Sequence, residues 1–178
     1  MFTRIARHGV VASAVSLAAA FTFAGSAIAA PAQNLSFAAS NDGASASWTH
    51  GPGSPIQLTM GTTAGSYAMV TLHHVSSGAV SSLTAPSFVT DNYAAGSPRY
   101  YLTLSDGHSL WGYPVNLSGE TLSWAIDNAN SYSTWSQVQL AEGAATVTGA
   151  YVIADADQAP GTVDTIDDLT FGGTTYTG

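Results

Sequence analysis

Residues 98–113 read PRYYLTLSDGHSLWGY and decide the fold class. Two runs of alternating character flank Asp106-Gly107, a pair that favours a two-residue turn because such a turn needs positive φ at both central positions. The stretch therefore predicts an antiparallel β-hairpin. In the expected register, four residues of one strand face four of the other: Ser105 faces His108, Thr103 faces Leu110, Leu102 faces Trp111 and Tyr100 faces Tyr113.

Alternation along this hairpin sorts its side chains onto two faces. The more apolar face is expected in the core, and it holds Tyr100, Leu102, Leu104, Trp111 and Tyr113. The other face mixes a ring, a cation and hydroxyl groups, which is typical of a sugar-binding face and equally of an ordinary half-exposed sheet. Its candidate ligand-binding residues are Arg99, Tyr101, Thr103 and His108.

Short alternating apolar runs continue along the chain between clusters of Gly, Pro, Ser, Asn and Asp. This spacing is typical of a sandwich or barrel rather than of alternating strands and helices. One short helix is expected near residues 135–142, because Thr134 and Gln137 form a capping-box pattern and Gly143 suits the left-handed position after a helix. We predict an all-β, antiparallel β-sandwich of jelly-roll type with this one helix.

Residues 1–29 have the three parts of a secretory signal peptide. Arg4 and Arg7 begin it, residues 10–23 form an uncharged apolar run, and Ala27-Ile28-Ala29 offers a small-residue cleavage site. The run is short for a bilayer span, which disfavours a membrane anchor. We expect cleavage after Ala29, a single β-sandwich domain over residues 30–178, and a secreted, extracellular protein with no membrane span after signal removal.

Charge and cysteine content exclude several classes of partner. The chain of 178 residues holds 3 Lys+Arg, 11 Asp+Glu and no Cys, and without its leader Arg99 is the only one of those cations left. Such a balance repels phosphate, so nucleic acid and anionic membrane surfaces are not expected partners. The lack of cysteine excludes disulfides and thiolate sites. Arg99 is expected either to pair with an Asp inside the fold or to bind a ligand.

Several pieces of the chain resemble a group of small secreted bacterial β-sandwich proteins that carry a Gly-Ser-Pro-Arg block. The resemblance rests on Gly96-Ser97-Pro98-Arg99, the Asp106-Gly107 turn, Trp111-Gly112-Tyr113 and residues 152–155 and 162–169. Residues 34–37 and 166–171 also resemble the first and last strands of jelly-roll carbohydrate-binding modules. That second resemblance implies a structural calcium ion held by Asp167, although Ala38 stands where those modules have an acid.

The late acidic residues suggest where such an ion would lie. Asp155 and Asp157 alternate, and oxygen ligands on alternate residues can face one calcium ion. The EF-hand pattern then fails, because Ala159 and Pro160 follow and no Glu closes the loop. The candidate metal ligands are therefore Asp155, Asp157 and Asp167, and the alternative is a solvated acidic loop.

These observations predict a non-catalytic binding or surface-associated module with extracellular polysaccharide as its partner. The 4 Trp and 8 Tyr of the chain favour this function, because sugar rings stack on aromatic side chains. Two alternatives stay open. One is a glycan-active hydrolase or lyase that uses Asp or Glu, and the other is a structural extracellular protein with no small ligand.

Overall fold

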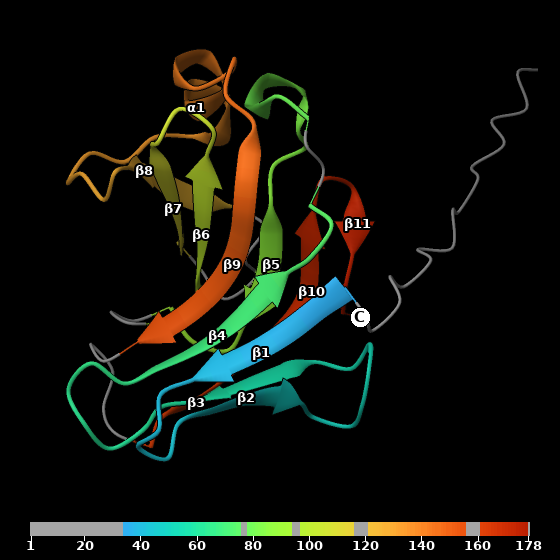
Figure 1. Cartoon of the computed structure of the whole chain (residues 1–178), viewed down its shortest axis with the longest axis vertical. Coiled ribbons are helices and arrows are strands. Elements are labelled where there is room, and N and C mark those ends of the chain that lie inside the picture. Colours follow the sequence, from blue (N-terminus) through green and yellow to red (C-terminus); the bar gives the residue numbers. More distant parts are fainter. Residues whose placement is uncertain (1–33, 76–77, 94–96, 116–120, 156–160, 178) are drawn as a thin grey trace, which may run out of the picture.

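Two antiparallel sheets pack as a sandwich in the computed structural model, which describes residues 34–75, 78–93, 97–115, 121–155 and 161–177 (Figure 1). The six-stranded sheet has the order β1-β4-β9-β6-β7-β8, with strands Leu35–Ala39, Tyr67–Leu72, Val147–Asp155, Arg99–Leu104, Ser109–Pro114 and Leu122–Ile126. The five-stranded sheet has the order β11-β10-β3-β2, with β5 also on β10; its strands are Thr174–Thr175, Val163–Phe171, Ile56–Thr59, Ser45–Trp48 and Ser87–Thr90. The predicted antiparallel β-sandwich is confirmed.

Alternate residues of the strands fill the space between the two sheets. In β9, Ala150, Val152 and Ala154 are fully buried, whereas Tyr151 and Ile153 point to the outside and are half-buried. The same alternation runs through β6, β7 and β4. One face of the six-stranded sheet therefore belongs to the core, and its other face is outward.

The β6–β7 hairpin differs from the predicted register by one residue. Tyr101 lies opposite Trp111, and Leu102 lies opposite Leu110. Within the turn, φ is positive at Gly107 (93°) and not at Asp106, so the loop holds three residues instead of two. Because a shift of one residue moves each side chain of a strand to the other face, the prediction that Trp111 and Tyr113 face the core is wrong.

Packing inside the sandwich explains this register. Gly112 faces the core, where an added Cβ would lie 2.8 Å from Cη2 of Trp124. The Trp124 ring on β8 is 1% exposed and stacks on Tyr100 with 6.2 Å between ring centroids. The predicted register would have put Tyr113, the residue expected opposite Tyr100, in the place of Gly112 against this ring, where only glycine leaves enough room.

The predicted helix is present as α1, Trp135–Ala141. Its capping box is also as predicted, with the Thr134 side chain accepting from the Gln137 N–H and Gln137 Oε1 accepting from the Thr134 N–H. The helix lies at one end of the sandwich, beside the β6–β7 turn (Figure 1). Among the described residues, no helix has the length and apolar character needed to cross a membrane.

The end of α1 differs from the expectation. Gly143 does not adopt the left-handed conformation expected after the helix. Its Cβ position instead lies 2.3 Å from the carbonyl oxygen of Gln139. The close approach of the backbone to the helix end, rather than a positive φ, is what requires glycine at this position.

Candidate functional site

A row of aromatic rings crosses the outward face of the six-stranded sheet. Tyr151 of β9, Tyr101 of β6 and Trp111 of β7 are register partners in neighbouring strands. The ring centroids of Tyr101 lie 5.7 Å from those of Tyr151 and 4.5 Å from those of Trp111. These separations bring each ring into direct contact with the next, so the row stabilises strand pairing through its own ring faces.

Arg99 lies beside this row, two residues before Tyr101 on β6, and is buried, with 8% of its surface exposed. Its guanidinium pairs with Asp155 of the neighbouring strand β9. The same group lies 5.3 Å from the Trp111 ring centroid and 5.9 Å from that of Tyr113, which are cation–π distances. The contacts favour the structural role of Arg99, and the ion pair joins two neighbouring strands of one sheet.

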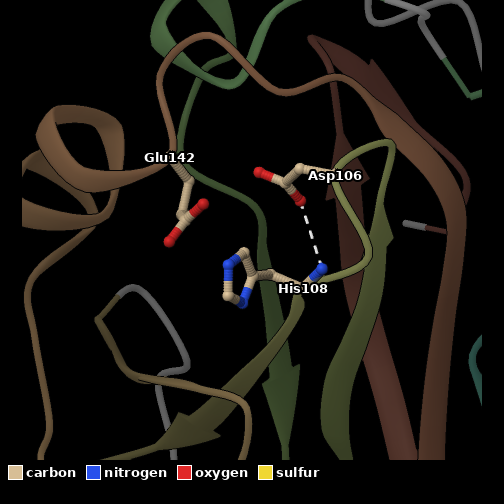
Figure 2. A group of neighbouring side chains, drawn as sticks. All are labelled: Asp106, His108 and Glu142. Atoms are coloured by element: carbon tan, nitrogen blue, oxygen red, sulfur yellow. Dashed lines mark hydrogen bonds between the residues drawn. The ribbon is translucent and has the colours of Figure 1, made fainter.

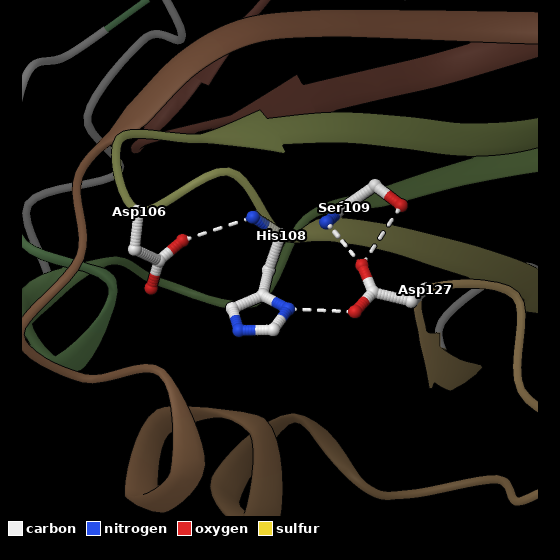
Figure 3. A network of polar contacts seen from close by, with 4 residues as sticks. All are labelled: Asp106, His108, Ser109 and Asp127. Atoms are coloured by element: carbon white, nitrogen blue, oxygen red, sulfur yellow. Dashed lines mark hydrogen bonds and ion pairs between the residues drawn. The ribbon is translucent and has the colours of Figure 1, made fainter.

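The four predicted ligand-binding residues do not form one group. Thr103 shares the outward face with Arg99 and Tyr101, and its Oγ1 lies 2.9 Å from Oγ1 of Thr148. His108 has the parity of the inward residues of β7 and lies at the strand end, where its ring faces α1 (Figure 3). Ligand binding by these residues stays a prediction, and the structure separates His108 from the other three.

A hollow of about 260 Å³ lies at the edge of the sandwich, between β8, the start of α1 and residues 85–86. We call it the aromatic hollow. Two aromatic rings that are at least partly exposed line it: Tyr132 is 62% exposed, and Trp135 is half-buried. The complete lining is Ala85, Pro86, Thr121, Leu122, Ser123, Trp124, Tyr132, Ser133, Thr134, Trp135 and Gln137.

Contacts below the aromatic hollow hold its rings in place. The indole N–H of Trp135 donates to the carbonyl oxygen of Leu83 at 3.1 Å, and its ring packs on Trp124 with 4.9 Å between centroids. Tyr132 meets Tyr113 edge to face at 5.7 Å. The hollow therefore adjoins the outward aromatic face through the contact between these two tyrosines.

The polar groups of the aromatic hollow are uncharged. Its lining, all of it in the described part of the chain, contributes hydroxyl groups and one amide but no acid or base. Aromatic rings beside neutral donors and acceptors match a ligand with apolar faces and hydroxyl edges.

A second group of polar side chains lies at the other end of α1. Asp106 and His108 come from the β6–β7 hairpin and Glu142 from the C-cap of the helix, and one ligand atom of each lies within 4.8 Å of the others (Figure 2). Nδ1 of His108 is 2.6 Å from Oδ2 of Asp127. Oδ1 of Asp127 accepts from the Ser109 N–H at 2.9 Å, which fixes the carboxylate beside the ring (Figure 3).

These neighbours shift the proton affinities of the group. The hydrogen bond to Asp127, followed by its charge, raises the pKa of His108 above its ordinary value. Hydrogen bonds from the Ser109 backbone and from His108 lower the pKa of Asp127. Partial burial is the main cause that raises the pKa of Glu142, with the charge of His108 opposing it.

The predicted calcium ligands are only partly within the described residues. Asp155 lies on β9 and Asp167 on β10, in different sheets, and Asp157 lies outside the described residues. Oδ2 of Asp155 is engaged by the Arg99 guanidinium, a positive group that disfavours a cation on the same carboxylate. The calcium site stays a prediction.

The alternative of a glycan-active hydrolase or lyase that uses Asp or Glu stays a prediction. Glu120 lies outside the described residues, and Glu142 lies beside Asp106 at the opposite end of α1 from the aromatic hollow.

A comparison of the chain with family models, curated proteins and solved structures finds no match in any of the three.

The sequence did not single out the aromatic hollow. Its lining comes from three segments, 85–86, 121–124 and 132–137, and no local pattern marks them as neighbours. The capping box was the one available signal, because it placed Thr134 and Gln137 at the start of a helix that had to pack on the sheet.

Proposed function

We propose that this protein is a secreted, non-catalytic module that binds a neutral extracellular polysaccharide, and that the polysaccharide enters the aromatic hollow. The observation that carries the proposal is the lining of the hollow, which combines the Tyr132 and Trp135 rings with uncharged hydroxyl and amide groups. The signal-peptide pattern of residues 1–29 supports secretion.

Two features favour a neutral glycan over an acidic one. The lining offers no cation to a carboxylate or sulfate. The chain as a whole has a formal net charge of −8 and contains no lysine, so its field repels polyanions. The volume of about 260 Å³ is below the roughly 300–1,000 Å³ of a typical ligand cleft, which suits a short stretch of a longer chain.

The proposal is tested by affinity electrophoresis of the secreted protein in gels that contain neutral polysaccharides, with alginate as the acidic comparison. We expect at least one neutral glucan, xylan or mannan to retard the protein and alginate to leave it unretarded. Tyr132→Ala should weaken the retardation about tenfold, because a truncated aromatic anchor costs about 1.4 kcal/mol or more.

Tyr93→Ala is the matched control, because Tyr93 is 57% exposed and follows a strand of the other sheet. It should bind like the unchanged protein. Equal retardation by alginate would contradict the neutral-glycan proposal, and release of reducing ends would show an enzyme instead. Retardation by none of the glycans would favour the structural alternative.

A further inference from the structure

Three electron-pair donors converge where the β6–β7 turn meets the end of α1. The donor atoms of Asp106, His108 and Glu142 lie within 4.8 Å of one another, and Figure 2 shows the three side chains turned toward a common space. The residues come from two elements that are 34 or more positions apart in the chain. Their meeting is therefore a product of the fold and not of a local run of acids.

The histidine is held with one nitrogen directed into this space. Nδ1 of His108 lies 2.6 Å from Oδ2 of Asp127, a carboxylate that can only accept, so Nδ1 carries the hydrogen of a neutral ring. Nε2 then carries a lone pair, and it lies on the side of Glu142 (Figure 2). A carboxylate that fixes the far nitrogen of an imidazole is the usual support of a metal-binding histidine.

Among the described residues, no lysine or free arginine is available to neutralise this convergence of acceptors. The chain contains no lysine, and the one arginine of the described residues, Arg99, is paired with Asp155. Three carboxylates, those of Asp106, Asp127 and Glu142, therefore surround one imidazole without a counter-charge from Lys or Arg.

We propose that Asp106, His108 and Glu142 bind a divalent cation, Zn²⁺ above all, and that Asp127 is the positioning residue of His108. One imidazole with carboxylates suits zinc, whereas calcium takes oxygen ligands. Ligands of tetrahedral zinc lie about 3.4 Å apart, so the donor atoms have to approach one another by up to about 1.4 Å, a movement open to the exposed Asp106 side chain.

The site is independent of the proposed glycan function, because it lies at the opposite end of α1 from the aromatic hollow. The test is a calorimetric titration of the protein with Zn²⁺, prepared without a polyhistidine tag and freed of metal by a chelator. We expect one Zn²⁺ per chain. His108→Gln should abolish this binding, and Asp127→Asn should weaken it about 10- to 100-fold while the three ligands remain.

A variant with both His73→Gln and His74→Gln is the matched control, since these histidines are exposed and lie outside the cluster. It should bind one Zn²⁺ with unchanged affinity. Zinc binding that survives His108→Gln, or that disappears in the control, would overturn the proposal. So would the absence of any binding by the unchanged protein, because a proton rather than a metal ion would then bridge the acceptors.

Discussion

Replacing Arg99 with Met removes the one guanidinium of the described residues and keeps an unbranched apolar stem in its place. The substitution breaks the ion pair with Asp155 and the cation–π contacts with Trp111 and Tyr113. Oδ1 of Asp155 is already buried without a hydrogen-bond partner among the described residues, so the loss of Arg99 leaves neither oxygen with a partner there. We expect the free energy of unfolding to fall.

The size of the loss follows from the exposure of the two side chains, which is 10% for Arg99 and 30% for Asp155. Stranding one partner of a fully buried pair costs about 3–5 kcal/mol, whereas a fully exposed pair contributes about 0–1 kcal/mol. A carboxylate that is 30% exposed lies between these limits, which places the cost near 2 kcal/mol. The lost cation–π contacts add about 0.5–1 kcal/mol. Arg99→Met should therefore destabilise the protein by about 2.5–3 kcal/mol.

Urea unfolding, followed by tryptophan fluorescence, measures this change through the midpoint and the slope m. The double variant Arg99→Met/Asp155→Asn is the control, because it removes the stranded charge and should recover about 1 kcal/mol of the loss. An Arg99→Met protein with the stability of the unchanged chain would refute the structural role of Arg99. The ligand-binding role would then be favoured.

Three other changes test the remaining contacts. The raised pKa of His108 means that its charged form stabilises the fold below its ordinary pKa, and that this contribution is lost as pH rises through the folded-state pKa. In chelator-treated protein, NMR titration should show a lower His108 pKa in Asp127→Asn than in the unchanged chain. An unchanged pKa would contradict Asp127 as the cause of the shift. Gly112→Ala places a Cβ against the Trp124 ring and should lower the free energy of unfolding in urea by about 1–3 kcal/mol. No loss of stability would favour the two-residue-turn register of the hairpin instead. Thr134→Ala removes the N-cap of α1 and should lower the free energy of unfolding by about 1 kcal/mol, measured by the same urea unfolding. An unchanged free energy of unfolding would contradict the role of the capping box.

Features with a local cause could be predicted from the sequence. The short helix follows from the side chains of Thr134 and Gln137, which cap their own helix, and the strands follow from alternation with the core on one side. The hairpin register could not be predicted in the same way. Both a two-residue and a three-residue loop place Gly107 at positive φ, and the choice between them depends on the contact of Gly112 with Trp124.

The candidate sites depend on contacts between residues far apart in the sequence more than the strands and the helix do. Arg99 was recognised from charge alone as a residue of interest, but its partner Asp155 lies 56 positions away and nothing nearby marks it. Tyr132 lies in a polar segment with no periodic pattern, so its place at the rim of the aromatic hollow follows only from the packing of α1 on β8. His108 was predicted to share a ligand-binding face with Arg99, from which the structure separates it, and its partners Asp127 and Glu142 were not singled out.

The place where a neutral polysaccharide binds is tested most directly by NMR, because the chain has 4 tryptophans and each gives one indole N–H resonance. On titration with a neutral oligosaccharide of a glycan that retards the protein, the Trp135 resonance in the aromatic hollow should shift most. The resonances of Trp48 on β2 and of Trp111 on the outward face should stay in place. A shift of Trp111 with no change at Trp135 would contradict binding in the hollow.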